Sequence, residues 1–284
     1  MDIIIDTDLG RDPDDFLAIT WLLAVGYNIK AIVISPGHED QVAVAKFILN
    51  RLGLTIPVGV SKPDKTKSSS GGSHYKILER YKFAKEAKED GLGWDIINSV
   101  YHENMELITI GPPTNTGGFL FGNDKIFKKI TMQGGFLPYS LYSPQNILDK
   151  FVGKNTIRTF NFGGDTRSTN IILERNCHER RIVGKNVCHT VVCDKEKLKN
   201  FKPHNDAAKL FVEFLTLHLD KKEGKAMHDP IACACHHEPN IGCWLKGNPV
   251  QYKNEWGTEL DPNGSDILGD LNHKLFWEKM YEFR

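Results

Sequence analysis

The chain has 284 residues, of which 36 are basic and 36 acidic, so its formal net charge is zero and its pI is about 7.2. This balance excludes the positive footprint of a nucleic-acid-binding protein and the polybasic patch of a membrane-surface protein. No apolar run approaches the ~18 residues that cross a bilayer, and the acidic N-terminus is unlike a signal peptide. The length fits one open α/β domain, and 40% hydrophobic residues suffice for a sizeable core.

The first fifteen residues, MDIIIDTDLGRDPDD, join an apolar run at 3–5 to a dense group of carboxylates. Ile-rich runs of this kind are typical of buried parallel strands. Apolar spacing over residues 16–22 then predicts a helix that carries carboxylates in its first turn. The aspartates of this stretch are Asp6, Asp8, Asp12, Asp14 and Asp15.

This acidic stretch follows a strand, and ligands of open α/β sheets bind beyond the carboxyl ends of the strands. Crowded carboxylates repel one another unless a cation joins them, and oxygen-only ligands suit Ca²⁺ or Mg²⁺. The preference of helix N-termini for acidic residues accounts for Asp14 and Asp15. It does not account for Asp6 and Asp8 at the strand end. We therefore predict a metal-binding or catalytic role for the stretch.

Two other acidic motifs do not fit the spacing. An EF-hand loop that started at Asp6 would have Gly at its sixth position and Glu at its twelfth, where this chain has Arg11 and Leu17. A haloacid-dehalogenase-like phosphatase has Thr or Val four residues after its first Asp, where this chain has Gly10. Both alternatives are therefore disfavoured.

The next segments alternate between strand and helix patterns. Strands at 29–35 and 57–60 flank a helix at 40–52, and this order predicts a parallel sheet with right-handed crossovers. The loop at 61–73, rich in Lys, Ser and Gly, is either a solvated connection or a lid over the site. Two helices, divided by a glycine-containing segment, are expected between residues 74 and 101.

Strands predicted at 107–110 and 126–132 end in the turns GPPTN (111–115) and QGG (133–135). Glycines favour tight turns, and turns at strand ends also bring backbone close to a ligand. Residues 136–158 lack periodicity. The remaining expected elements are a helix from Asp165 to Leu173, a strand at 182–190, a helix at 204–218, one or two strands after residue 250, and a closing helix at 275–283.

The six cysteines form no CxxC pair, and in a chain of this length we interpret them as reduced core residues of a cytosolic protein. Cys233 and Cys235 precede His236 and His237, which raises the alternative of a zinc site. A CxC pair followed at once by two histidines does not match the usual spacing of zinc ligands.

These motifs resemble, in the same order, those of the inosine-uridine-preferring nucleoside hydrolase family. DTDLG at 6–10 with the Asp14-Asp15 pair is similar to the family's DTDxG and aspartate pair, and GPPTN resembles its GPLTN-type turn. Phe160-Asn161 with Asp165, and then His228-Asp229-Pro230, are similar to its FN…D and HDP motifs. The resemblance covers residues 2 to about 235. It implies one α/β domain, residues 1–284, with a mostly parallel, Rossmann-like open sheet flanked by helices and a small additional β element.

The resemblance also implies a calcium-dependent hydrolase that cleaves the N-glycosidic bond of a ribonucleoside or a related ribosyl compound. Carried onto this chain, the Ca²⁺ ligands are Asp8, Asp15, Asp229 and the backbone carbonyl of Met132, with Thr131 as the alternative carbonyl. Asp8 would also be the general base, because it stands beside the ion that lowers the pKa of the attacking water.

The same resemblance assigns the remaining site residues. Asp14 and Asn161 would hold ribose hydroxyls, and His228 would be the acid near the leaving base. His38 and Thr159 take the places of a family asparagine and a family glutamate in the sugar subsite. These two departures leave open whether the 5′ group of the substrate is a hydroxyl, a phosphate or a larger substituent.

The implied partners are a small nucleoside-like molecule and further copies of the chain in a homodimer or homotetramer, with no nucleic acid or membrane. The expected setting is purine or pyrimidine salvage in the cytoplasm. A non-catalytic ribosyl-ligand-binding protein is an alternative because of His38 and Thr159, although such a binder needs neither a base nor an acid. A Mg²⁺ phosphohydrolase is a third reading, disfavoured because only Arg11 supplies a cation near the aspartates.

Overall fold

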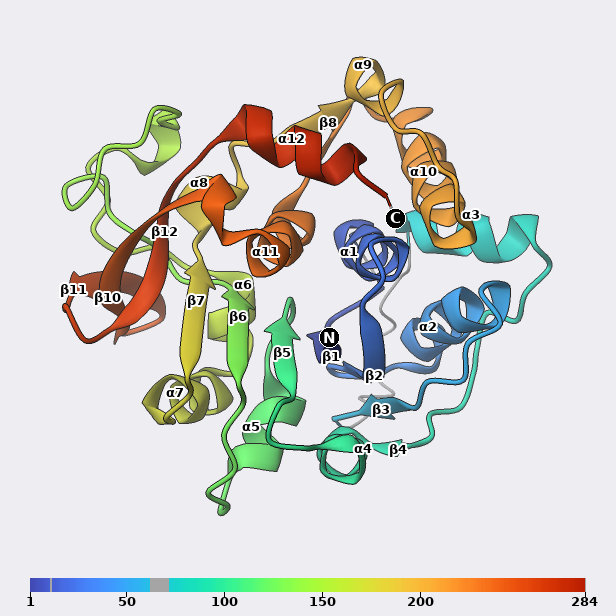
Figure 1. Ribbon diagram of the computed structural model, residues 1–284, viewed down its shortest axis with the longest axis horizontal. Helices are drawn as coiled ribbons and strands as arrows, with labels where there is room; N and C mark the ends of the chain where they lie inside the picture. Colours follow the sequence, from blue (N-terminus) through green and yellow to red (C-terminus); the bar gives the residue numbers. More distant parts are fainter. Residues whose placement is uncertain (11, 62–71, 284) are drawn as a thin grey trace.

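The computed structural model describes residues 1–10, 12–61 and 72–283 (Figure 1). Strands and helices alternate through the first half of the chain, as the sequence pattern predicts. In chain order these elements are β1 (Asp2–Thr7), α1 (Asp14–Ala24), β2 (Asn28–Ile34), α2 (Glu39–Arg51), β3 (Val58–Val60), α3 (Gly72–Arg80), β4 (Gly91–Leu92), α4 (Gly93–Val100), β5 (Glu106–Thr109), α5 (Thr114–Leu120) and β6 (Lys129–Gln133).

The second half begins with an irregular segment that contains one short 3-10 turn, η1 (Asp149–Phe151). Short helices and strands then lead to a C-terminal hairpin and a closing helix. These elements are α6 (Phe160–Gly164), α7 (Thr166–Glu174), β7 (Glu179–Val183), α8 (Lys185–Cys188), β8 (Val192–Asp194), α9 (Lys195–Leu198), α10 (Asp206–Leu219), β9 (Gly224–Ala226), α11 (His228–His237), η2 (Pro239–Ile241), β10 (Gly242–Tyr252), β11 (Glu255–Leu260), β12 (Ser265–Leu271) and α12 (His273–Tyr281).

In the described ranges ten strands form one sheet, in the order β11-β10-β12-β7-β6-β5-β1-β2-β3-β4. Neighbouring strands are parallel except where β10 pairs with β11 and with β12. Strands β8 and β9 form a separate antiparallel pair. The predicted fold class, a mostly parallel α/β sheet with a small additional β element, is confirmed.

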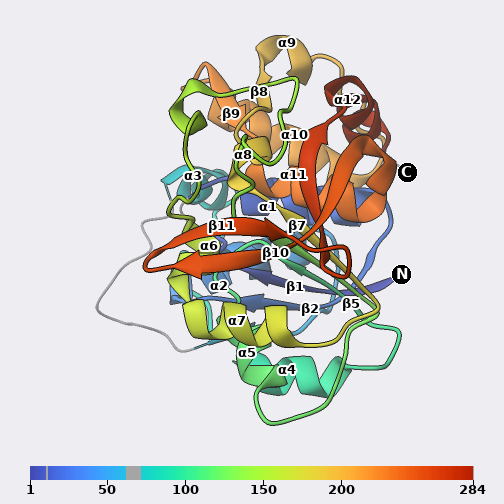
Figure 2. The ribbon, with the colours of Figure 1, turned by 90° about the vertical axis from the view of Figure 1, so that its left-hand side faces the viewer.

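Helices cover both faces of the sheet, with α1, α10 and α11 on one side and α4, α5 and α7 on the other (Figures 1 and 2). Side chains of β1 alternate between these two layers. Ile3 and Ile5 belong to the hydrophobic cluster beneath α1, whereas Ile4 belongs to the cluster on the α5 side. This alternation follows from the two-residue period of a strand that is buried on both faces.

Strand β1 lies at the point where the sheet changes direction. The chain runs from β1 outward through β2, β3 and β4, and it returns to the other side of β1 to continue through β5, β6 and β7. In doubly wound sheets a crevice for ligands opens at such a switch point, beyond the carboxyl ends of the strands. The loops after β1 and β5 both lie there.

Three predicted segments differ from the structure. The strand expected at 182–190 ends at Val183, because Gly184 starts a helical turn in which Val187 and Cys188 are buried on one side. The C-terminal region has three strands, and β10 begins eight residues before position 250. The residues that divide the two helices expected at 74–101 form the edge strand β4.

Two further expectations concern the loop and the membrane. Residues 62–71, which make up most of the predicted loop or lid at 61–73, lie outside the described residues. Within the part of the chain that the structure describes, no helix is long and apolar enough to span a bilayer.

Candidate active site

The end of β1 is tied to the start of α5 through Asp6. The buried carboxylate of Asp6 accepts hydrogen bonds from the backbone N–H of Thr116 at 2.9 Å and from its hydroxyl at 2.7 Å. The side-chain amide of Asn115 donates to the other oxygen at 3.3 Å. Burial raises the pKa of Asp6 to about 7 in spite of these donors. The GPPTN turn therefore fixes Asp6 as a structural residue.

Four other carboxylates, Asp8, Asp14, Asp15 and Asp229, gather beside this turn, and we call them the acidic cluster. Asp14 and Asp15 open α1, and Asp229 lies in the first turn of α11. Single carboxylate oxygens of Asp14, Asp15 and Asp229 all lie within 4.8 Å of one another, and all three residues are buried. Segments more than two hundred residues apart thus supply one group of oxygen ligands.

The pKa values of the acidic cluster follow from its burial. Burial raises the pKa of Asp15 and Asp229 well above its usual range, and the neighbouring carboxylates add to the effect. The pKa of Asp8 rises to about 8, first through burial and then through the charge of Asp14. The hydroxyl of Thr7 donates to Asp15. Without a cation these carboxylates therefore cannot all be ionised near neutral pH.

The pKa of Asp14 shifts in the opposite direction because a lysine and a histidine approach its carboxylate. Burial alone would raise the pKa of Asp14, but Lys225 and His228 hold it below its usual range. The Lys225 ammonium lies 3.4 Å from Asp14 Oδ2, and His228 Nδ1 lies 3.1 Å from the same oxygen. Lys225 is itself buried and also lies 2.6 Å from Asp12.

His228 stands over the acidic cluster with one ring nitrogen engaged. Its Nδ1 faces Asp14, and its Nε2 is buried and has no hydrogen-bond partner among the described residues. The ring of His189 lies 4.5 Å from that of His228. Burial and the neighbouring His228 lower the pKa of His189 to about 3, so this ring is neutral. Lys150 Nζ lies 3.1 Å from His189 Nδ1.

A cavity of about 600 Å³ contains these groups. Its lining includes both carboxylates and lysine and histidine side chains. Its lining residues are Asp8, Asp12, Pro13, Asp14, Asp15, Ile110, Gln133, Gly134, Thr159, Phe160, Asn161, Lys185, His189, His218, Lys222, His228 and Asp229.

The sequence matches the family of inosine-uridine preferring nucleoside hydrolases over residues 3–277. The chain belongs to this family. Its members are metal-dependent N-glycosyl hydrolases of nucleosides. Among the described residues, Asp14, Asp15 and Asp229 of the acidic cluster form one of the groups of side chains that could hold a metal. An uncharacterized protein from Aquifex aeolicus (strain VF5) is 27% identical over 260 residues, which is 87% of each chain.

Solved structures share the fold of this nucleoside hydrolase at low sequence identity. A plant nucleoside hydrolase superposes with a TM-score of 0.73 at 16% identity, covering 99% of this chain and 98% of its own. The purine-preferring ribonucleoside hydrolase from Gardnerella vaginalis gives 0.69 at 18% identity, covering 99% and 97%. The inosine-uridine preferring nucleoside hydrolase from Bacillus anthracis gives 0.69 at 13% identity, covering 98% and 97%.

Two residues expected to contact the sugar line the cavity of this nucleoside hydrolase. Asn161 Nδ2 lies 3.0 Å from the carbonyl of Ile110, 3.1 Å from that of Gln133 and 2.6 Å from the Gln133 side-chain oxygen. Thr159 is 5% exposed, and its hydroxyl has no hydrogen-bond partner among the described residues. The sugar-binding roles of both residues stay predictions.

His38 and Met132 do not line the cavity as it is described. The N–H of His38 donates to Gln41 Oε1 at 2.9 Å, and Gln41 Nε2 donates to the backbone carbonyl of Asp8 at 3.1 Å. The turn at His38 therefore holds the acidic loop in place through its backbone. Met132 is buried in β6, and the cavity begins at the next residue, Gln133. The carbonyl ligand stays a prediction.

Sequence reasoning missed Lys225 and His189, which belong to no motif. The signal for Lys225 is a charged residue inside a short strand, three positions before His228. The core role expected of the cysteines is confirmed for Cys233 and Cys235, which are buried in the hydrophobic cluster under α1, but it is wrong for Cys243, which is exposed on β10. The adjacent His236 lies 3.0 Å from Glu106 and 2.8 Å from the Thr131 hydroxyl, so it is a structural residue.

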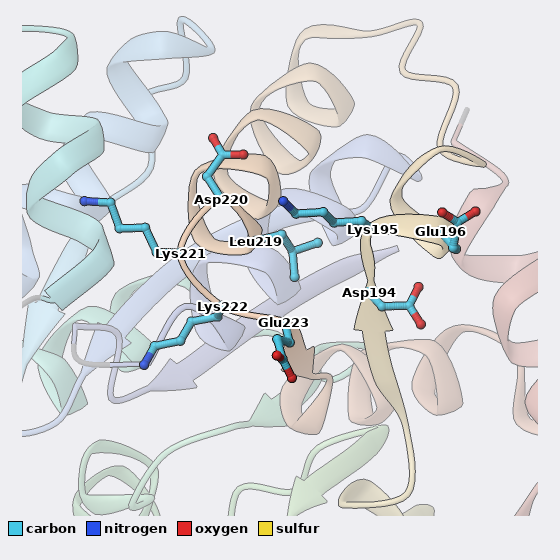
Figure 3. Close-up of a pocket in the computed structure, with 8 residues that line it drawn as sticks. All are labelled: Asp194, Lys195, Glu196, Leu219, Asp220, Lys221, Lys222 and Glu223. Atoms are coloured by element: carbon cyan, nitrogen blue, oxygen red, sulfur yellow. The ribbon is translucent and has the colours of Figure 1, made fainter.

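A second hollow of about 570 Å³ lies beside β8 and the loop after α10 (Figure 3). Its side chains carry both charges, and most of them are exposed. Asp194 is paired with Lys197 at 2.9 Å, and Glu196 with Lys199 at 2.6 Å. Such a surface has no buried group aimed at a ligand, so the cavity at the acidic cluster is the candidate active site.

Proposed function

We propose that this enzyme is a calcium-dependent hydrolase that cleaves the N-glycosidic bond of ribonucleosides or a related ribosyl compound, releasing ribose and the free base. The supporting observation is the approach of Asp15 and Asp229, two proposed ligands whose buried carboxylates lie within 4.8 Å of each other and of Asp14, the carboxylate assigned to the ribose. This convergence at a sheet switch point suits a hard cation beside a small sugar.

The donor set fits Ca²⁺. The donors are oxygen atoms, which Ca²⁺ prefers. Burial raises the pKa of Asp15 and Asp229, so these carboxylates need a nearby positive charge to be ionised together. Asp8, Asp15, Asp229 and the carbonyl of Met132 or Thr131 would hold the ion. When bound, Ca²⁺ would lower the pKa of a water molecule and bind the ribose diol.

Within this proposal Asp8 is the general base, since it lines the cavity and belongs to the acidic cluster. It would accept a proton from the water that attacks the anomeric carbon. His228 would donate a proton to the leaving base, because its Nε2 is the ring atom that Asp14 does not engage. The base leaves with the electron pair of the glycosidic bond while positive charge develops on the sugar. It therefore needs that proton in order not to depart as an anion.

Asp14, Asn161, His38 and Thr159 would contact the ribose. Asp14 would offer a carboxylate to the sugar hydroxyls, and Asn161 would offer an amide; both line the cavity. Asn161 is oriented by three acceptors, and this restriction would reduce the entropy that the amide loses on binding. His38 would act at the rim of the cavity, because it is not one of the lining residues and its N–H is bound to Gln41.

A specific observation favours a second candidate, a hydrolase of 5′-substituted nucleosides such as 5′-monophosphates. The buried Thr159 hydroxyl lacks a partner and can donate a hydrogen bond, unlike the glutamate of the family motif. Lys185 Nζ lies 3.0 Å from the carbonyl of Arg158, next to Thr159, and Lys185 lines the cavity. A neutral donor and a nearby cation would tolerate a phosphate that a carboxylate would repel.

The comparison that separates these two substrates is kcat/KM for a nucleoside and for its 5′-monophosphate. For a 5′-substituted substrate, Thr159→Glu should shift that ratio toward the nucleoside by about tenfold or more, roughly 1.4 kcal/mol. Thr156→Glu is the matched control, because Thr156 lies three positions away and bonds Glu255 instead of lining the cavity. A strong preference of the unmodified enzyme for a free 5′-hydroxyl would exclude the second candidate.

We also infer the setting of the enzyme. Its ligand would be a small nucleoside-like molecule, and it would act in purine or pyrimidine salvage in the cytoplasm as a homodimer or homotetramer. Six free cysteines fit a reducing compartment.

The proposed reaction is tested by incubating metal-depleted enzyme with a nucleoside panel and measuring free ribose. We expect release after Ca²⁺ is added and none in the presence of a chelator. Metal analysis of protein prepared with calcium should find one ion. Ligand binding without ribose release would support a non-catalytic binder, and phosphate release from phosphate esters would support a phosphohydrolase.

A further inference from the structure

Lys225 is a buried cation that no motif explains. Its side chain is 4% exposed, and its ammonium lies 2.6 Å from Asp12 Oδ1 and 3.4 Å from Asp14 Oδ2. A buried lysine is retained only where carboxylates compensate the loss of its hydration. Asp12 belongs to the loop that leads into α1 and also carries Asp8, and Asp14 is the first residue of α1.

The backbone around Lys225 is held firmly. Lys225 pairs with Cys193 in the small β8–β9 sheet, and the N–H of Met227 donates to the carbonyl of Val191 at 3.0 Å. At Gly224 a side chain would meet Val192 Cγ1 at 2.6 Å, so the strands approach closely there. The position of the ammonium is therefore defined by packing and not by a flexible loop.

Lys225 and His228 reach the same oxygen atom. They are three residues apart in one segment, and both approach Oδ2 of Asp14, which lies on a segment more than two hundred residues earlier. An ammonium can only donate, so Lys225 holds Asp14 Oδ2 from one side as an acceptor. The same oxygen faces His228 Nδ1, and this contact fixes which ring nitrogen is left to face the cavity.

We propose that Lys225 is a positioning residue for the leaving-base acid: it holds Asp14 in the orientation that directs His228 Nε2 toward the base. This inference rests on the proposed nucleoside hydrolysis. Lys225 touches neither the substrate nor the reacting atoms. It links the loop before α1 to the segment before α11, and it acts on the reaction through Asp14 and His228.

The test compares two substrates that differ in their need for an acid. Inosine requires protonation of its leaving base, whereas p-nitrophenyl riboside releases a stable phenolate without it. Lys225→Met should lower kcat/KM for inosine by about tenfold or more beyond its effect on p-nitrophenyl riboside, because both substrates share the ribose contact of Asp14 and only inosine needs the acid. Lys225→Arg, which keeps the cation, should restore most of the activity toward inosine.

A matched control comes from Lys129, a mostly buried lysine of β6. Its ammonium lies 3.7 Å from Glu106 of β5 and 3.2 Å from the carbonyl of His236, near the other end of α11. Lys129→Met loses a comparable ion pair but should change both substrates equally. If methionine at position 225 prevents folding, Lys225→Gln removes the charge more gently and should show the same unequal loss. Equal losses on both substrates in the position-225 variants would overturn the proposal, since a structural defect does not distinguish leaving groups.

The proposal and the function beneath it fail in different ways. Wild-type enzyme that cleaves neither substrate would refute nucleoside hydrolysis itself. Wild-type enzyme that cleaves both, with a Lys225→Met variant that keeps its full preference for inosine, would refute only the role of Lys225. A direct readout is the orientation of the His228 ring in crystal structures: we expect Nδ1 to face Asp14 in the wild type and to lose that contact in Lys225→Met.

Discussion

If the acidic cluster binds calcium as proposed, we expect the stability of this enzyme to depend on pH and on calcium together. In the metal-free fold, burial raises the pKa of Asp8 to about 8, whereas the unfolded chain releases this proton near 3.8. The folded protein therefore binds more protons than the unfolded chain between these pH values. A raised pKa of this kind stabilises the fold below pH 4, and the contribution is lost as the pH rises toward 8.

The magnitude follows from counting one proton held by the acidic cluster. Each such proton changes the free energy of unfolding by about 1.4 kcal/mol per pH unit, so metal-free protein should lose about 2.7 kcal/mol between pH 5 and pH 7. Calcium binding requires that proton to leave. The gain in stability at a fixed calcium concentration should therefore be about 2.7 kcal/mol larger at pH 7 than at pH 5.

Urea unfolding at the two pH values, with calcium or with a chelator, measures this difference. Asp229→Asn should remove most of the calcium effect, because it deletes one of the converging carboxylates. Asp124→Asn is the matched control, since the Asp124 side chain is fully exposed. A calcium gain that is the same at both pH values would refute the reasoning, because it would mean that no proton is displaced from the cluster.

Three further predictions concern single side chains. Asp8→Asn should keep the fold but lower kcat by about 10² or more, as measured on the best nucleoside, and near-normal activity would refute the base assignment. His228→Ala should slow inosine far more than p-nitrophenyl riboside; an equal loss would instead mean a structural role. Thr116→Val removes the hydroxyl that donates to the buried Asp6, and it should cost about 1–3 kcal/mol of unfolding free energy in urea titrations. An unchanged midpoint would contradict the structural role of Asp6.

Most of the sheet could be predicted from the sequence because its strands are buried on both faces. The apolar runs that became β1, β2, β5 and β6 stand out from their surroundings, and each is followed by a turn with Gly, Pro or Asp. The C-terminal strand β10 did not stand out. Its side chains are mostly half-exposed or exposed, so polar and apolar residues mix without a clear period.

The site was predictable where a local pattern carries it and not where the tertiary fold creates it. The carboxylates of the first fifteen residues crowd within one short stretch, and the preference of helix N-termini for acidic residues does not account for Asp8. Lys225 and His189 have no such pattern, because their meaning depends on what lies across from them. In the sequence Lys225 looks like a solvated lysine because it follows the Lys-rich segment before β9, and only the approach of Asp14 shows otherwise.

Asp6 and Asp8 have different surroundings because Asp6 lies within β1, whereas Asp8 lies just beyond its end. Asp6 lies on the same face of β1 as Ile4, so it points to α5 and is taken up by the N–H and hydroxyl of Thr116. Thr7 lies on the opposite face and donates to Asp15 at the start of α1. Asp8 follows the last residue of the strand, so no neighbouring strand or helix fixes its side chain in the same way. The period of two therefore assigns Asp6 to structure, and it leaves Asp8 as the first carboxylate of the stretch that is free to do chemistry.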